Sequence, residues 1–339
     1  MKLGKGWRVW VGGVAGALVM LALAGRGYEV FAEANDAKAF KATGMLVDIG
    51  GRKLHIDCTG SGSGPVVVVE AGAGTPAMTW LPVQRLVQNS GKICTYDRAG
   101  FGSSDPAPNP SRSFDDRAAD LYNLLHAAKL QPPYILVGEA YGGFIVRRFA
   151  SDHPKEVAGV VLVDALEEQE AFTHYPEMKA KYEFRNQLGA WAASEGLMRA
   201  YVRAAPAAEA SKALWDNYTP EERDQLVATL SNPKYWQTEA HEGDAYTMTP
   251  QSMRGAGGFG TLGSTPLFVL VHGGSLPAPL RAQEEGWSKA QSRLASLSSV
   301  SRTVTARNAG HAIAEDDPAL VAKTIGDLKI AIKGGARKL

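Results

Sequence analysis

One pentapeptide in this chain has the spacing of a nucleophilic centre but lacks the nucleophile. The segment Gly138-Glu139-Ala140-Tyr141-Gly142 follows an apolar run and precedes a helical pattern, as a Gly-x-Ser-x-Gly turn between a strand and a helix would. The central residue of such a turn holds a strained backbone, and the glycines let neighbouring elements approach closely. Alanine stands in the serine slot, so the pattern predicts a nucleophile position, Ala140, that has no hydroxyl to attack a carbonyl.

Four further motifs follow in an order that could complete such a site. Their residue types suit acid–base chemistry and the binding of an oxyanion by backbone N–H groups. A histidine can act as the base, and a carboxylate can hold its tautomer. The motifs are the turn Glu70-Ala71-Gly72-Ala73-Gly74, the segment from Tyr96 to Asp105, the strand end Val163-Asp164, and Asn308-Ala309-Gly310-His311.

The elements that must position these residues alternate between strands and helices. Strands are predicted at 45–48, 53–58, 66–69, 92–96, 134–137, 157–163, 267–271 and 301–305, and helices at 114–130, 144–151 and 317–332. The first two strands form a hairpin around Gly50-Gly51. The alternation predicts a mostly parallel sheet covered on both faces. Residues 165–262 show helical patterns, such as 220–230, and no convincing strand, which predicts a helical cap.

In this combination the motifs resemble those of the α/β-hydrolase superfamily over roughly residues 45 to 332. The chain is most similar to the branch with an exported leader, a Glu-Ala-Gly turn in place of His-Gly, and a Tyr-Asp-Arg-Ala-Gly-Phe-Gly segment. The resemblance implies a mostly parallel eight-stranded sheet with helices on both faces. It divides the chain into a hydrolase core, residues 45–164 and 263–332, and a helical cap insertion, residues 165–262.

The resemblance also assigns roles to individual residues. Ala140 takes the nucleophile position and His311 that of the base, and the backbone N–H groups of Ala73 and Tyr141 form the oxyanion hole. The alternative for His311 is a core histidine bonded to backbone. Glu139 is not a candidate nucleophile, because its side chain should point away from the substrate.

The acid is assigned by comparing two positions that family members use. Many members place it after the strand that is 267–271 here, but the loop 272–277 has no carboxylate. Others, including one class of haloalkane dehalogenases, place it where this chain has Asp164. Asp164 is therefore the expected acid, unless it only caps the next segment, in which case Glu167 or Glu168 replaces it. Asp97 and Arg98 are expected to form a structural ion pair beside the elbow.

The two cysteines also fall into place through the resemblance. In the family the strand that ends near Cys58 is antiparallel to the strand that begins near Cys94 and lies next to it. If the chain is exported, a disulfide between them is expected. Two buried free thiols are the alternative.

The N-terminus carries the signature of an export signal. Lys2, Lys5 and Arg8 precede an uncharged run from 9 to 24. This run is shorter than the roughly 20 residues that usually span a membrane. Residues 1–27 are thus predicted to be a signal peptide or an anchor, with cleavage after Ala24 left open. Either way the remainder is periplasmic or extracellular. A short amphipathic helix is predicted at 28–40, ended by Gly44.

Composition excludes other classes of partner. The 339 residues have a net charge of +1 and are 21% charged and 45% hydrophobic, as in an ordinary globular protein. Near-neutral charge gives no reason to expect nucleic acid. No metal or cofactor is expected, because no His-x-x-x-His or Cys-x-x-Cys spacing occurs. The histidines without a catalytic context are His55, His126, His153, His174, His241 and His272.

The missing hydroxyl leaves three interpretations. In the first interpretation, the chain is a Ser→Ala variant of a working hydrolase that acts on an ester or related carboxylic acid derivative. Alternatively it is a ligand-binding protein or receptor on the same fold, or it uses His311 and Asp164 for cofactor-free chemistry that needs only a base. Cap aromatics suggest an apolar pocket, although such residues more often form the core of the cap itself. They are Trp191, Tyr201, Trp215, Tyr218, Tyr235 and Trp236.

Overall fold

The computed structural model describes residues 5–40, 42–109, 112–204, 215–244, 259–274 and 284–335, with 5–9, 170–182 and 244 described by backbone alone. Its centre is a single eight-stranded sheet in the order β1-β2-β4-β3-β5-β6-β7-β8. The strands are β1 (Met45–Asp48), β2 (Lys53–Thr59), β3 (Val66–Glu70), β4 (Ile93–Tyr96), β5 (Tyr134–Glu139), β6 (Val157–Val163), β7 (Leu267–His272) and β8 (Ser301–Ala306).

The sheet is mostly parallel, as predicted. Only β1 with β2 and β2 with β4 pair antiparallel, and the other pairs are parallel. The β-branched run of β3 is buried at every position. Successive side chains of a strand point to opposite faces, so such a run requires cover on both sides of the sheet.

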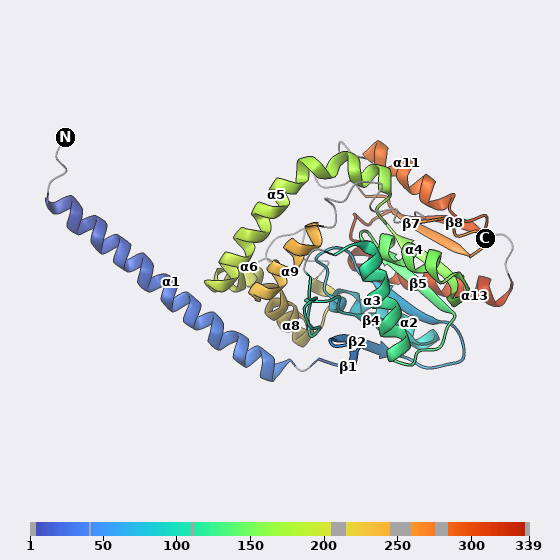
Figure 1. The fold of residues 1–339 in the computed structure, drawn as a ribbon, viewed down its shortest axis with the longest axis horizontal. Coiled ribbons are helices and arrows are strands. Elements are labelled where there is room, and N and C mark those ends of the chain that lie inside the picture. The colour runs from blue at the N-terminus through green and yellow to red at the C-terminus, as the bar shows by residue number, and fades with distance from the viewer. Residues whose placement is uncertain are drawn as a thin grey trace.

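Helices supply that cover in two layers (Figure 1). Alternate strand residues such as Val68 and Leu136 join a core with α3 (Phe114–Ala127), α4 (Gly142–Asp152) and α11 (Glu284–Ala295). Their neighbours Val67 and Val137 join a second core on the opposite face. The helices of that face are α2 (Leu81–Val87), α12 (Ile313–Asp316) and α13 (Pro318–Lys333).

A helical insertion lies between β6 and β7. It comprises α5 (Glu168–Ser194), α6 (Leu197–Ala204), α8 (Pro220–Ser231) and α9 (Pro233–Asp244), and the described part of 165–262 contains no strand. The predicted 220–230 helix is α8, which begins at a capping box between Thr219 and Glu222. The insertion has a small core of its own around Trp215 and Leu226.

The N-terminal segment differs from the expectation of a short separate helix at 28–40. It forms one continuous helix, α1 (Lys5–Ala39), which projects from the body of the molecule (Figure 1). The sequence between 5 and 39 has no proline to break it, and Gly25 and Gly27 are tolerated within it. Its stretch Trp10–Ala39 is long and apolar enough to cross a membrane, and none of the apolar window is buried.

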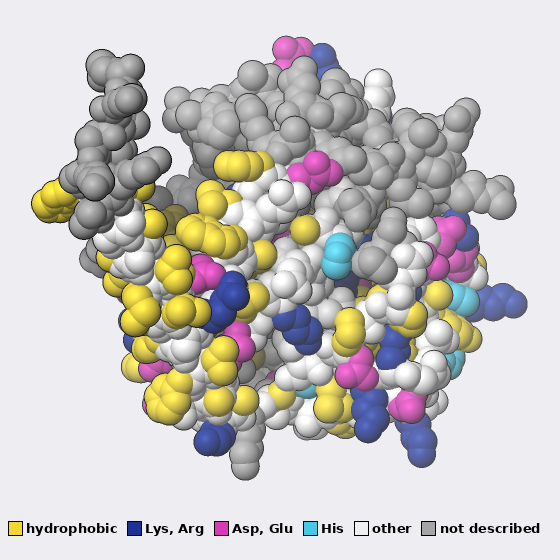
Figure 2. Space-filling view, turned by 60° about the vertical axis from the view of Figure 1, so that its left-hand side comes forward, with side chains coloured by type: hydrophobic (Ala, Val, Ile, Leu, Met, Phe, Trp, Pro, Cys, Tyr) yellow, Lys and Arg dark blue, Asp and Glu magenta, His cyan; other side chains and the backbone are white. Residues whose placement is uncertain are grey.

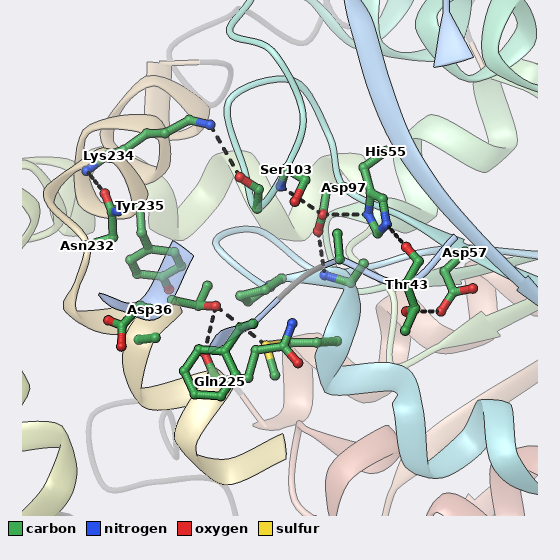
Figure 3. A pocket seen from close by; sticks show the side chains of 18 of the residues that line it. Asp36, Thr43, His55, Asp57, Asp97, Ser103, Gln225, Asn232, Lys234 and Tyr235 are labelled. Atoms are coloured by element: carbon green, nitrogen blue, oxygen red, sulfur yellow. Dashed lines mark hydrogen bonds and ion pairs between the residues drawn. The ribbon is translucent and has the colours of Figure 1, made fainter. Parts of the chain in front are cut away.

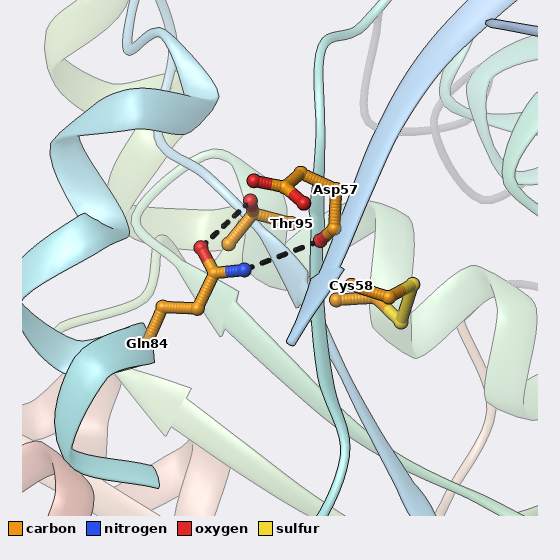
Figure 4. Close-up of a disulfide and its surroundings, with 5 residues drawn as sticks. Asp57, Cys58, Gln84 and Thr95 are labelled. Atoms are coloured by element: carbon orange, nitrogen blue, oxygen red, sulfur yellow. Dashed lines mark hydrogen bonds between the residues drawn. A yellow bond between two sulfur atoms is a disulfide. The ribbon is translucent and has the colours of Figure 1, made fainter. Parts of the chain in front are cut away.

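The two cysteines form the expected disulfide. Cys58 of β2 and Cys94 of β4 are directly paired in the antiparallel register, and their Cα atoms are 4.0 Å apart. Beside the bond, Gln84 of α2 donates to the carbonyl of Asp57 and accepts from the hydroxyl of Thr95 (Figure 4). The disulfide links β2 to β4, and Gln84 links both strands to α2.

Candidate active site

Ala140 occupies the tight turn that joins β5 to α4. Its φ of 44° lies in the left-handed region, which is uncommon for a residue with a side chain. The turn is held by the Ala140 N–H, which donates to the Val163 carbonyl at 3.0 Å. A Cβ on Gly138 would lie 2.5 Å from the side chain of Val146, so only glycine fits there. Position 140 therefore has the strained left-handed backbone that the sequence predicts for the turn between a strand and a helix.

The glycine-rich turn after β3 packs directly on this elbow. A Cβ on Gly142 would lie 2.3 Å from the carbonyl oxygen of Glu70, so the two segments meet backbone to backbone. Ala73 belongs to the β3 turn, and Tyr141 immediately precedes α4. Both segments therefore converge at Ala140, and the N-terminal end of α4 adds its partial positive charge.

His311 and Asp164 are in direct contact. His311 Nδ1 donates to Asp164 Oδ2 at 2.6 Å, with the aspartate wholly buried and the imidazole partly exposed. Asp164 follows β6 with a φ of 43°, and His311 follows β8. Neither Glu167, which pairs with Arg293, nor Glu168, which pairs with Arg147, has an ion pair with His311 among the described contacts.

Sequence reasoning missed a second histidine at the same aspartate. His272 at the end of β7 donates through Nδ1 to Asp164 Oδ2 at 2.8 Å and through its backbone N–H to Oδ1 at 3.2 Å. Trp287 of α11 adds an indole N–H at 2.9 Å. Burial alone would raise the pKa of Asp164, but the hydrogen bonds from His272 and His311 outweigh it and hold that pKa below its usual value.

Glu139 is turned into the protein beneath the elbow. Its Oε2 accepts from the Gly72 N–H at 3.2 Å and from Trp80 Nε1 at 3.1 Å. Burial raises the pKa of Glu139. Burial and the nearby charge of Glu139 also raise the pKa of Glu315 in α12 to about 8. Glu139 thus holds the glycine-rich turn through Gly72, and its carboxylate is engaged by these two donors.

Arg98 is the centre of a buried polar network under the glycine-rich turn. It donates to the carbonyls of Ala71 at 2.7 Å and Gly72 at 2.6 Å, and to Glu70 at 2.8 Å. Its other carboxylate partner is Glu242 of α9, at 2.5 Å and 2.9 Å. The expected ion pair between Asp97 and Arg98 is therefore wrong. The Arg98 guanidinium pairs instead with the buried carboxylates of Glu70 and Glu242.

Asp97 instead pairs with His55 at the edge of a separate cavity. His55 Nδ1 lies 2.9 Å from Asp97 Oδ2 (Figure 3). The cavity has a volume of about 250 Å³ and lies among the end of α1, β2 and the insertion. Its lining includes Asp36, Lys234 and Tyr235 but neither Ala140 nor His311. It is distinct from the centre at Ala140.

The six insertion aromatics have different surroundings among the described residues. Trp215 and Tyr218 are buried, whereas Trp191 and Tyr201 are exposed. Tyr218 donates to the Thr79 carbonyl at 2.8 Å, and Tyr235 donates to the Gly74 carbonyl at 2.6 Å. The described residues contain no group of three or more His, Cys, Asp or Glu side chains placed to hold a metal ion.

Comparison with known proteins supports one family. The family model of the alpha/beta hydrolase fold matches residues 64–243. The chain is 29% identical over 281 residues to the uncharacterised protein YqjL of Bacillus subtilis (strain 168), covering 83% of this chain and 89% of that protein. A 110-residue stretch is 33% identical to an AB hydrolase superfamily protein of Gibberella zeae and covers 32% of this chain and 34% of that protein.

Solved structures share the fold at low sequence identity. A thermophilic esterase from Thermogutta terrifontis superposes with a TM-score of 0.60 at 21% identity, covering 86% of this chain and 99% of the esterase. The enol-lactonase from Burkholderia xenovorans LB400 gives a TM-score of 0.59 at 19% identity, with coverages of 84% and 99%. The family match, the sheet order and the strand–turn–helix at Ala140 agree, and the chain belongs to the α/β-hydrolase fold family.

Proposed function

We propose that the site at Ala140 is a carboxylic ester hydrolase centre from which only the nucleophilic hydroxyl is missing. The proposal depends on two features that occur together. Ala140 has a left-handed backbone in its turn, and His311 Nδ1 lies 2.6 Å from Asp164 Oδ2 as a base–acid pair. A protein that had long abandoned hydrolysis would have had less reason to keep both. The chain as written is expected to be inactive and corresponds to a Ser→Ala variant of a working hydrolase.

Each residue has a defined role in the parent reaction. A serine in place of Ala140 would attack the carbonyl carbon of the ester while His311 takes the hydroxyl proton. The N–H groups of Ala73 and Tyr141 would stabilise the negative charge on the carbonyl oxygen. His311 then returns the proton to the departing alcohol. Water attacks the acyl-enzyme with His311 again as base, the bond between the serine oxygen and the acyl carbon breaks, and His311 gives the proton to the serine as the acid leaves. Asp164 stabilises the protonated imidazole.

The insertion is proposed to act as a cap over this centre. Two of its α9 residues contact the glycine-rich turn at the same position. Glu242 accepts from the Gly74 N–H at 2.9 Å, and Tyr235 donates to the Gly74 carbonyl at 2.6 Å. Through these contacts the cap fixes the turn that carries Ala73. The substrate would then be a small ester-like molecule enclosed between the cap and the carboxyl edge of the sheet.

The N-terminal segment is proposed to export the chain and hold it at a membrane. The basic residues before the apolar run favour a cytoplasmic N-terminus, which leaves the hydrolase core periplasmic or extracellular. The length and exposure of the apolar part of α1 support a signal peptide or an anchor. The disulfide between Cys58 and Cys94 agrees with an oxidising compartment.

A second candidate function rests on the same base–acid pair without a nucleophile. His311 is held by Asp164 whatever residue occupies position 140, so it could accept a proton from a carbon acid or from water. This cofactor-free chemistry, a pure ligand-binding role and the ester hydrolase proposal predict different effects of Ala140→Ser and His311→Ala on activity.

The test compares p-nitrophenyl acetate and butyrate hydrolysis by the chain as written, by Ala140→Ser, and by Ala140→Ser with His311→Ala. Loss of a triad nucleophile lowers kcat by about 10⁶-fold, so Ala140→Ser should raise hydrolysis by several orders of magnitude. The added His311→Ala should remove the gain. A ligand-binding protein leaves all three inert. A fourth protein, His311→Ala with Ala140 unchanged, tests base-only chemistry, which predicts a reaction of the chain as written that this variant lacks.

A further inference from the structure

The outer face of the insertion exposes large apolar side chains at helical spacing. Phe184, Leu188 and Trp191 recur at intervals of four and three along α5, which places them on one side of that helix. Leu197 and Tyr201 do the same on α6. All five are between 49% and 69% exposed, although the helices bury other faces against α8 and α9. We call these five residues the outer apolar face.

The outer apolar face adjoins the apolar N-terminal helix. Between Trp191 and Leu197, the turn from α5 to α6 meets α1 so closely that a Cβ on Gly25 would lie 2.3 Å from the Glu195 carbonyl oxygen. Glu195 also pairs with Arg26 at 2.7 Å. At about 1.5 Å per helical residue, Trp191 lies roughly 6 Å along α5 from this contact.

A buried ion pair fixes the orientation of α1 relative to the insertion. Arg199 of α6 pairs with Glu29 at 2.5 Å and with Asp36 at 2.8 Å, and both Arg199 and Glu29 are almost fully buried. Two contacts separated by two helical turns prevent α1 from swinging freely. The apolar half of α1 therefore leaves the molecule in a fixed direction relative to α5 and α6.

The helices that carry the outer apolar face lie beside α1. In Figure 1, α5 runs across the direction of α1, on the side from which the N-terminal part of α1 projects. Hydrophobic side chains gather in Figure 2 along α1 and continue onto the adjoining surface. On α1 itself Tyr28, Val30 and Phe31 extend the exposed apolar surface to the contact point. Apolar surface is thus continuous from the candidate spanning segment to the insertion.

We propose that the outer apolar face rests on the surface of a lipid bilayer, with α5 and α6 lying in the membrane interface beside the point where α1 enters it. A contiguous exposed apolar patch marks an interaction site, and continuity with α1 identifies the bilayer as the partner. The aromatic residues Trp191, Tyr201 and Tyr28 are of the types enriched where a protein crosses the headgroup region. The proposal rests on the proposed anchoring by α1 and extends the expected membrane contact beyond residues 1–27.

The proposal is tested with the full chain in phosphatidylcholine–phosphatidylglycerol vesicles. Single cysteines are introduced by Leu188→Cys and Tyr201→Cys, with Val14→Cys in α1 as the lipid reference. Ile330→Cys in α13 is the matched control, because Ile330 is an apolar residue away from α1 whose exposure of 72% is at least that of Leu188 and Tyr201. Each cysteine receives a nitroxide, and collision with oxygen and with a water-soluble nickel chelate is measured. Circular dichroism verifies folding of each variant.

The expected result is more oxygen collision and less nickel collision at Leu188 and Tyr201 than at Ile330, in the direction seen at Val14. Water-like values at Leu188 and Tyr201 together with a lipid value at Val14 overturn the docking of the insertion and leave the anchor intact. Water-like values at all four positions overturn the anchor as well, and the docking proposal fails with it. Neither result bears on the ester hydrolase proposal.

Discussion

Replacing Glu242 tests whether the insertion stabilises the glycine-rich turn through Arg98. The Glu242 carboxylate accepts from Arg98 at 2.5 Å and 2.9 Å and from the Gly74 N–H at 2.9 Å. Glu242→Ala leaves the buried guanidinium with Glu70 as its carboxylate partner and deprives the Gly74 N–H of this acceptor. Removing one partner of a buried ion pair costs about 3–5 kcal/mol. Unfolding entropy of about 2.1 cal/mol/K per residue then predicts a Tm lower by about 4–7 °C for a chain of 339 residues.

The assay is thermal unfolding followed by circular dichroism in one detergent for all variants. Glu285→Ala is the matched control, because Glu285 is an exposed glutamate paired with exposed Lys289 one helical turn away. Such exposed pairs contribute little to stability, so the control should lose less than about 1 °C. A Glu242→Ala variant that unfolds within 1 °C of the control would refute the reasoning.

Three further predictions concern pH, the acid and the disulfide. The folded pKa of Glu315 is raised from 4.5 to about 8, so the folded state binds more protons over that interval and stability falls as pH rises from about 5 to 8. At 1.36 kcal/mol per pKa unit the loss is at most about 5 kcal/mol, reduced by partial exposure, and urea titrations of Glu315→Gln should show a flatter profile. Asp164→Asn in the Ala140→Ser background should lower kcat by about 10³–10⁴-fold in the ester assay; an unchanged kcat would exclude Asp164 as the acid. Replacing Cys58 and Cys94 by serine removes a cross-link between residues 36 positions apart and should lower the free energy of unfolding by about 4 kcal/mol. Equal urea midpoints for the double-serine variant and the disulfide-bonded chain would contradict this prediction.

Local patterns were sufficient to predict most of the sheet, whereas the pairing of Cys58 with Cys94 was expected from the strand order that the family resemblance implies. Strands such as Val157–Val163 have the predicted bounds, because a valine-rich apolar run between turn residues favours a buried strand. The helix from Glu284 to Ala295 was not predicted, although Trp287, Ala290 and Leu294 form one buried face of it. Their spacing of three and four residues is a helical signal, but the two and three mostly polar residues that separate them weaken the apolar pattern.

The contacts around Asp164 illustrate what one sequence does not specify. The contact with His272 spans 108 residues and that with Trp287 spans 123 residues, and side-chain partners at such separations depend on the assembled sheet. The parallel neighbours β6 and β7 do end side by side, so the strand order alone places His272 near Asp164. Arg98 was misassigned for the same reason, because its partner Glu242 lies 144 residues away on the insertion.

The most direct test of the central claim is covalent labelling of position 140. Ala140→Ser, the chain as written, and Ala140→Ser with His311→Ala are each treated with a fluorophosphonate and analysed by intact-mass and peptide mass spectrometry. A hydrolase centre that lacks only its hydroxyl predicts a single adduct on the peptide containing position 140, present in Ala140→Ser and strongly reduced without His311. Absence of the adduct from a folded Ala140→Ser protein would contradict the account and leave ligand binding or base-only chemistry as the function of the site.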